Sequence, residues 1–186
     1  MSLADDVRSV LEAWSAPDAH NEELRRSYLA HMDAHPGALS RTCAAGHLTA
    51  SAAVLDPTGS KGVLTLHGKV GLWLQTGGHF EEGDTTLAGA ALREAEEESG
   101  IRGVEVLPDP VRLDRHRVGC CGGTWHLDVQ FAAVAPDGAV LTIDPEESDD
   151  LGWFPVDGIP DPTDDACRAL FAAASEKVRA RPPLRR

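Results

Sequence analysis

The sequence predicts an α+β fold in which helices pack on a mixed β-sheet. Segments with helical spacing of apolar residues lie near both ends of the 186-residue chain and once in its middle. Strand-like segments fill the space between them without a regular strand–helix–strand rhythm. Apolar residues make up 42% and charged residues 25%, which is typical of a globular protein and excludes a disordered or fibrous chain. The length corresponds to roughly one domain with a modest extension.

The N-terminal segment is predicted to be helical. Apolar residues recur at helical spacing over 3–15 and 20–34, and Pro17 separates the two stretches. We therefore expect a helical extension over residues 1–40, which acts in packing or as a lid, ahead of a main domain over residues 41–186.

The remaining elements follow from the spacing of apolar residues and from the turn residues between them. A turn at 56–59 indicates a hairpin between the first two strands. Gly100 ends the most strongly predicted helix, over 85–99, and a closing helix is predicted over 164–179. Strands are expected at 47–56, 62–67, 72–75, 103–117, 124–135 and 151–155.

The charge of the chain restricts its partners. Asp and Glu number 30 against 17 Lys and Arg, which gives a formal net charge of −13. Such a surface repels the phosphates of nucleic acid, so we expect no nucleic-acid partner. No apolar run approaches the roughly 20 residues that span a bilayer, and acidic residues interrupt the N-terminal stretch where a secretory signal needs apolar ones. The expectation is a cytoplasmic protein without membrane contact.

The cysteines suggest no zinc ribbon, because Cys43, Cys120, Cys121 and Cys167 form no C-x-x-C pair. Reduced, partly buried thiols are the plain interpretation. A metal cluster in which Cys120 and Cys121 join His116 and His126 remains as an alternative.

The helix over 85–99 carries a row of carboxylates. Glu94, Glu97 and Glu98 are spaced i, i+3, i+4 and fall within a sector of about 100°. Small and apolar residues occupy the neighbouring sector, so this helix can pack against a sheet, and Arg93 lies beside Glu97. Like charges at this spacing repel one another, whereas Mg²⁺ or Mn²⁺ bound to the carboxylate oxygens reverses the sign of the interaction. The alternative is a solvated acidic face.

Residues 77–101 (GGHFEEGDTTLAGAALREAEEESGI) resemble the signature of the Nudix hydrolase family, G-x5-E-x7-R-E-U-x-E-E-x-G-U, in which U is a bulky aliphatic residue. Gly78 matches the first glycine, and the segment 93–101 matches the second half in register. The segment between the two parts is one residue longer than the pattern. The acidic position of the loop therefore falls on Asp84 counted from Gly78, but on Thr85 counted back from Arg93.

The resemblance implies an α/β/α sandwich around a mixed sheet and hydrolysis of a nucleoside diphosphate linked to another moiety, with Mg²⁺ or Mn²⁺. By analogy Glu97 and Glu98 bind the metal, and Glu94 is a ligand or the base that activates water. The Gly78 carbonyl completes the set of ligands, and Arg93 orients a glutamate. The resemblance implies a small-molecule nucleoside diphosphate derivative as partner, and homodimers are common in the family.

Further site residues are predicted outside the signature. Glu147 resembles the late acidic residue that serves some family members as base or extra ligand, with an ordinary exposed loop as the alternative. His79 and His126 are candidate substrate-binding residues, because His79 follows the glycine pair and His126 shares a strand face with Asp128; structural roles are the alternative. Four aromatic side chains either stack on a base or belong to the core: Trp73, Trp125, Phe131 and Trp153.

Two other function classes remain open. One is a non-catalytic module of this family that binds a nucleotide metabolite, which has no use for a water-activating carboxylate face. The other is an isomerase of prenyl diphosphates, which needs a placed cysteine, and Cys43 lies in no matching context.

Overall fold

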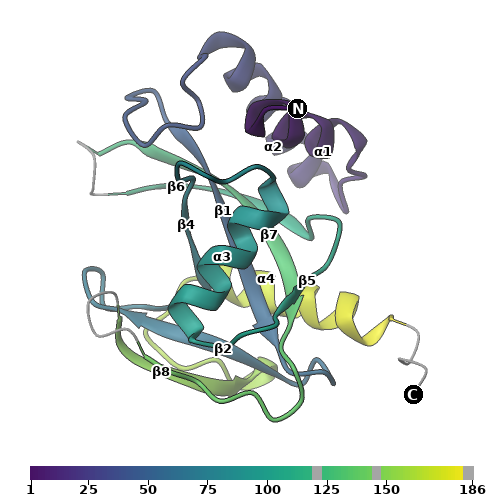
Figure 1. Ribbon diagram of the computed structural model, residues 1–186, viewed down its shortest axis with the longest axis vertical. Coiled ribbons are helices and arrows are strands. Elements are labelled where there is room, and N and C mark those ends of the chain that lie inside the picture. Colours follow the sequence, from purple (N-terminus) through teal and green to yellow (C-terminus); the bar gives the residue numbers. More distant parts are fainter. Residues whose placement is uncertain (119–122, 144–147, 182–186) are drawn as a thin grey trace.

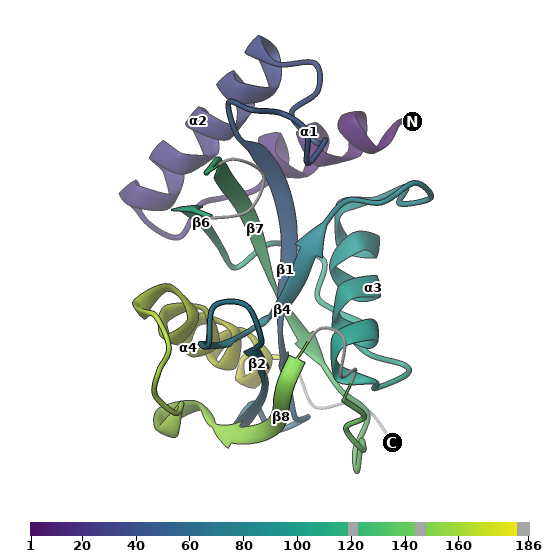
Figure 2. The ribbon, with the colours of Figure 1, turned by 90° about the vertical axis from the view of Figure 1, so that its left-hand side faces the viewer.

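A curved mixed β-sheet forms the centre of the molecule, with helices on both faces (Figures 1 and 2). The structure is a computed structural model that describes residues 1–118, 123–143 and 148–181. The helices are α1 (Leu3–Ala13), α2 (Ala19–Ala34), α3 (Leu87–Ser99) and α4 (Asp165–Arg179), with a short 3-10 turn at Val156–Gly158. The strands are β1 (His47–Leu55), β2 (Lys61–His67), β3 (Trp73–Leu74), β4 (Thr76–His79), β5 (Glu105–Val106), β6 (Arg112–Arg117), β7 (Trp125–Val134) and β8 (Ser148–Pro155). The predicted α+β class and the N-terminal helices are confirmed.

The sheet is organised around the parallel pair β1 and β7. These strands run side by side from His47 opposite His126 to Leu55 opposite Val134. Strands β5 and β6 line the outer edge of β7, and β4 lies antiparallel along the other edge of β1. Beyond β4, β1 continues its pairing with β2, which carries β3 and β8. Strand β1 therefore connects all parts of the eight-stranded sheet of the described chain.

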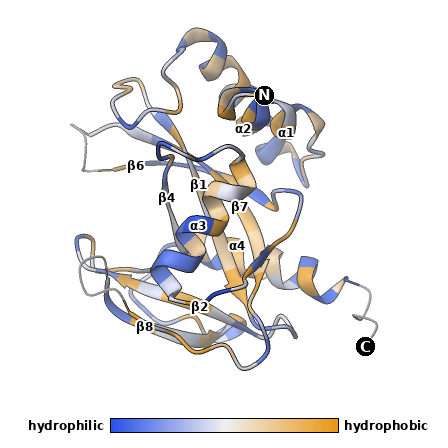
Figure 3. Cartoon of the chain, viewed as in Figure 1, coloured by the Kyte–Doolittle hydropathy of each residue, from blue (hydrophilic) through white to orange (hydrophobic). Residues whose placement is uncertain are grey.

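Alternate residues of β1 enter two different cores. Ala50, Ala52 and Val54 belong to the core under α1, α2 and α3, whereas Ala53 and Leu55 belong to the core under α4. Figure 2 shows α3 and α4 on opposite sides of β1. In Figure 3, β7 is largely hydrophobic behind α3, whose own surface carries hydrophilic residues. The small side chains on the first face allow α3 to lie close to the sheet.

Helix α3 begins at Leu87 rather than at the predicted residue 85, because Thr86 is its N-cap. The Thr86 hydroxyl oxygen accepts the Gly89 N–H at 3.1 Å, and Asp6 of α1 accepts the Leu87 N–H at 2.7 Å. The helix ends at Gly100, as predicted, and this residue adopts φ 68°, a left-handed conformation that suits glycine.

Two predicted strands differ from the structure. The segment 103–117 is divided into β5 and β6, because Pro108 and Pro110 have no N–H to contribute to a ladder. Strand β8 begins at Ser148 instead of 151, since it follows β2 as far as His67. The other predicted helices have nearly the bounds observed. Within the described residues, no helix combines the length and the apolar character needed to cross a membrane.

The N-terminal helices are bound to the edge of the sheet. The side-chain oxygen of Asn21 on α2 accepts the buried Leu113 N–H of β6 at 2.8 Å, and the Tyr28 hydroxyl donates to the Asp114 carbonyl. Val7 and Leu11 of α1 are fully buried in the same core as the sheet residues. Helix α2 therefore supplies hydrogen-bond partners to a strand edge that would otherwise need solvent.

Replacing Asn21 tests whether the predicted boundary near residue 40 separates two independently stable units. In Asn21→Ala the Leu113 N–H is buried without its acceptor, which should lower the free energy of unfolding by about 1–3 kcal/mol. Urea unfolding followed by circular dichroism and by tryptophan fluorescence should give one coincident transition at lower urea concentration.

Glu23→Ala, an exposed substitution on the same helix, is the control and should unfold like the unaltered protein. A separate early transition of the helices in Asn21→Ala, with the sheet unaffected, would contradict a shared cooperative unit.

Candidate active site and a histidine cluster

Arg93 on α3 brings together the loop after β4 and the acidic side of the helix. Its Nη1 donates to carboxylate oxygens of Glu94 at 2.9 Å and Glu97 at 3.0 Å. Its Nε and Nη2 donate to the two oxygens of Asp84 at 3.2 and 3.0 Å, and Nη2 also donates to the His79 carbonyl at 2.9 Å. The side chain that the sequence predicts to orient a glutamate therefore contacts two of them.

Asp84 is the acidic partner of Arg93 from the loop. Its side chain is 7% exposed, and it also accepts the Glu81 N–H at 2.8 Å. Burial by itself raises the pKa of Asp84, but the hydrogen bonds from Arg93 and the loop backbone outweigh it and leave the pKa below its usual range. The extra loop residue is therefore accommodated with Asp84, and not Thr85, facing the arginine.

The three predicted glutamates lie along one side of α3. Glu94 is 13% exposed and Glu97 is 52% exposed, while Glu98 is half-buried in the turn that follows Glu94. The neighbouring side packs against the sheet through residues that are fully or almost fully buried: Leu87, Ala90, Ala91, Ala95 and Ser99. The helical spacing thus produces a packed small-residue face with carboxylates beside it, as predicted.

Gly78 on β4 lies directly against Glu94. A Cβ added at Gly78 would come within 2.7 to 2.9 Å of the three carboxylate atoms of Glu94. Only a residue without a side chain allows this approach of backbone and carboxylate. Carboxylate and carbonyl oxygens are the donors that Mg²⁺ and Mn²⁺ prefer, so the residues present fit a hard divalent cation.

Some predicted site residues fall outside the described part of the chain. These are Glu147, the candidate base, and Cys120 and Cys121, the candidate partners of His116 and His126. Of the candidate stacking residues, Phe131 is fully buried in the core, and Trp125 has the guanidinium of Arg115 4.4 Å above its ring. Trp73 contacts Phe154 edge-on, and Trp153 is partly buried against the main core.

His79 and His126 lie near each other on the sheet, together with His47, which the sequence analysis did not single out. The three ring centroids are 4.8 to 4.9 Å apart. His47 and His126 are direct neighbours on β1 and β7, and His79 on β4 lies opposite Thr49. The pairing of β1 with β7 creates this cluster, and no local pattern at residue 47 reveals it.

The histidine rings are partly or fully buried. Burial first, and then the nearby His79, His47 and His116, lower the pKa of His126 to about 3. Burial also lowers the pKa values of His47 and His79. The rings are therefore neutral at neutral pH, and each keeps a nitrogen lone pair.

The strand face beyond the histidines is polar and buried. Asp128, on the same face as His126 as predicted, accepts hydrogen bonds from Thr49 at 2.9 Å, Ser51 at 2.6 Å and Gln130 at 3.1 Å. Burial raises the pKa of Asp128 despite these bonds. The carboxyl group is thus held by the neighbouring strand β1 and by Gln130 of its own strand, and is not directed at the glutamates of α3.

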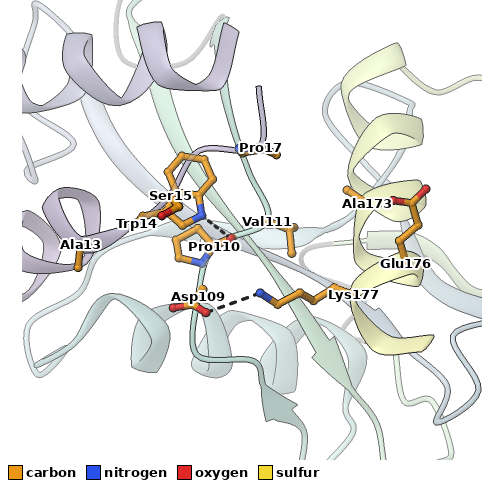
Figure 4. A pocket seen from close by; sticks show the side chains of 10 residues that line it. All are labelled: Ala13, Trp14, Ser15, Pro17, Asp109, Pro110, Val111, Ala173, Glu176 and Lys177. Carbon is orange, nitrogen blue, oxygen red and sulfur yellow. Dashed lines mark hydrogen bonds and ion pairs between the residues drawn. The ribbon is translucent and has the colours of Figure 1, made fainter. Parts of the chain in front are cut away.

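A cleft of about 560 Å³ lies elsewhere, between the segment after α1, the segment before β6, and α4 (Figure 4). Trp14 Nε1 donates to the Pro110 carbonyl at 2.7 Å at its floor, and Lys177 Nζ lies 3.6 Å from an Asp109 carboxylate oxygen. Its lining includes none of the predicted site residues. The candidate active site is therefore assigned from the glutamates and not from this cleft.

Comparison with known proteins identifies the fold. A family model described as NUDIX domain matches residues 46–173. A NUDIX-family hydrolase from Clostridium perfringens is 22% identical with a TM-score of 0.57, over 71% of this chain and 95% of that one. An ADP-ribose pyrophosphatase from Streptococcus suis is 20% identical with a TM-score of 0.53, over 73% of this chain and 93% of that one.

The NUDIX domain of Shewanella oneidensis NrtR, solved with ADP-ribose, is 21% identical with a TM-score of 0.50, over 70% of this chain and 87% of that one. A search of curated protein sequences finds no match. At these identities the structural likeness establishes the fold, and the domain model spans most of the chain, including the helix with its glutamates. The chain belongs to the Nudix hydrolase family.

Proposed function

We propose that this Nudix hydrolase cleaves the pyrophosphate linkage of a nucleoside diphosphate joined to another moiety, with Mg²⁺ or Mn²⁺ as cofactor. The observation that carries the proposal is the convergence of Glu94 and Glu97 on Arg93, with the Gly78 backbone directly against the Glu94 carboxylate. Four carboxylates lie within ion-pair distance of one guanidinium when Asp84 and Glu81 of the loop are included, so the cluster keeps a negative charge that a divalent cation would balance.

The family resemblance suggests a role for each residue, and the positions of Arg93, Glu94 and Glu97 support these roles. Glu97 and Glu98 would hold the cation with the Gly78 carbonyl, and Glu94 is either a further ligand or the base that takes a proton from water. Arg93 positions the Glu94 and Glu97 carboxylates through its hydrogen bonds. The cation, when bound, neutralises phosphate oxygens and lowers the pKa of coordinated water. This matters for a protein whose net charge of −13 repels a pyrophosphate.

Other parts of the proposal rest on the family resemblance. Glu147 is proposed as base or additional ligand, and His79 and His126 stay predicted substrate contacts. The substrate class is a small nucleoside diphosphate derivative, and ADP-ribose is the first compound to test, because two structural neighbours carry it in their names. A homodimer and a cytoplasmic location also stay predictions.

The direct test is a panel of nucleoside diphosphate derivatives, beginning with ADP-ribose, incubated with the protein and Mg²⁺ or Mn²⁺. Release of two phosphate-containing products supports the proposal. Binding of a compound without product release would instead favour the non-catalytic module, and rearrangement of a prenyl diphosphate would favour the isomerase. Absence of cleavage throughout a broad panel would overturn the hydrolase assignment.

Replacing Glu97 should abolish most of the turnover while preserving the fold. Glu97→Gln removes a carboxylate charge from a half-exposed side chain, so kcat should fall about 10²- to 10⁴-fold with little change in the thermal unfolding midpoint.

The matched control is Glu96→Gln on the same helix. The Glu96 carboxylate accepts the Gly103 N–H at 2.7 Å and faces Arg102, so its role is in the segment after α3. This variant should keep its kcat within a few-fold. Equal turnover of Glu97→Gln and the unaltered protein would exclude Glu97 from the reaction.

Replacing Gly78 should weaken metal binding without unfolding the protein. The three atoms nearest to the added methyl group of Gly78→Ala belong to the end of the flexible Glu94 side chain, and φ of Gly78 lies outside the left-handed region, so the cost in stability is small. The Glu94 carboxylate must move, which should raise the dissociation constant for Mn²⁺ about 10- to 100-fold. Electron paramagnetic resonance of free Mn²⁺ measures this constant.

Gly37→Ala is the control, since an added Cβ at that exposed position has no atom within 4 Å. Its Mn²⁺ affinity should be unchanged. If Gly78→Ala also binds Mn²⁺ as tightly as the unaltered protein, then the Gly78–Glu94 contact is not part of the metal site.

A further inference from the structure

Three neighbouring strands of the sheet place one histidine each close together on the same face. His47 of β1 is directly opposite His126 of β7 in the parallel ladder. His79 of β4 pairs with Thr49, two positions along β1 from His47 and therefore on the same face. The backbone hydrogen bonds of the sheet, rather than a loop, thus determine where the three rings lie.

The ring nitrogens of these residues converge. One nitrogen from each of the three lies within 4.8 Å of the other two, and Nε2 of His47 is 3.0 Å from Nε2 of His79. Nε2 of His126 is buried and has no hydrogen-bond partner among the described residues, whereas Nε2 of His47 and Nε2 of His79 share a hydrogen bond with each other. A buried nitrogen without a partner costs free energy, which a ligand at this point would recover.

The donor set identifies the class of ligand. Three neutral imidazoles with no carboxylate among them suit a borderline transition metal and not the hard cations that bind oxygen. In a tetrahedral zinc site the bond length of 2.0–2.1 Å puts ligand nitrogens about 3.3 Å apart, so modest ring rotations close the observed cluster onto one ion. We propose that His47, His79 and His126 form a second metal site, which binds Zn²⁺.

The histidine site is separate from the glutamates of α3. Gly78 and His79 are consecutive on β4, so their faces are opposite: Gly78 faces Glu94, whereas the His79 ring faces His47. His47 is fully buried, and His79 and His126 are half-buried, which leaves one side of the cluster accessible to solvent. Three protein ligands also leave the fourth tetrahedral position to water or to a small ligand.

The bound ion would join β4 to β1 and β7. Strand β4 carries Gly78 and the His79 carbonyl that accepts from Arg93, so it forms part of the candidate active site. Zinc therefore acts as a cross-link behind the glutamates and should raise the thermal unfolding midpoint.

The test uses the full chain freed of metal with a chelator and then titrated with Co²⁺ or Zn²⁺ in excess Mg²⁺, which occupies oxygen sites. Co²⁺ in a four-coordinate nitrogen site gives strong visible absorption, and Zn²⁺ should displace it at one equivalent. His126→Ala removes one of three ligands, so the affinity for zinc should fall by at least about 100-fold. This loss exceeds the loss of affinity that follows when a group that only orients a ligand is removed. Zinc should also no longer raise the unfolding midpoint of His126→Ala.

The control is His20→Ala, an exposed histidine on α2, which should bind Zn²⁺ like the unaltered protein. Glu97→Gln should also keep the visible Co²⁺ bands, and this separates the zinc site from the proposed hydrolysis. Each of three outcomes would overturn the proposal: the unaltered protein shows no Co²⁺ bands, His126→Ala binds zinc as tightly as the unaltered protein, or Glu97→Gln loses the bands. If circular dichroism shows that His126→Ala does not fold, His79→Ala replaces it.

Discussion

The hydrogen bonds of Arg93 are the interaction on which the candidate active site depends. Asp84, Glu94 and Glu97 lie close enough to repel one another, and a single half-buried guanidinium bonds to all three. The same group bonds to the His79 carbonyl and so ties the end of β4 to α3. The carboxylates are therefore held in place by the protein itself, and their number exceeds the positive charge beside them.

Strand β4 separates two groups of side chains with different chemistry. Because successive residues point to opposite faces, the oxygen-rich group about Gly78 and the nitrogen-rich group about His79 are adjacent in sequence but lie on different sides of the sheet. Hard cations prefer the first group and borderline metals the second. A single short strand can in this way position two kinds of ligand without competition between them.

The N-terminal helices contribute to the same framework. Helix α2 supplies an acceptor and a donor to the edge of β6, and Asp6 of α1 accepts a hydrogen bond from the first turn of α3. The helix that carries the glutamates is consequently held in three ways. It packs on the sheet, its own Arg93 bonds to the loop and to β4, and α1 accepts a hydrogen bond from its first turn. The family model begins at residue 46, so the support that α1 and α2 provide comes from outside the matched domain.

The sequence by itself determined the local features of this protein. The spacing of Glu94, Glu97 and Glu98, the stop at Gly100 and the α+β class follow from residue periodicity, which acts over a few residues. Only the tertiary structure decided that Asp84 rather than Thr85 faces Arg93, and that His47 joins His79 and His126. The first contact depends on loop geometry, and the second depends on the parallel pairing of β1 with β7. These strands are far apart in the chain, and no local pattern specifies their register.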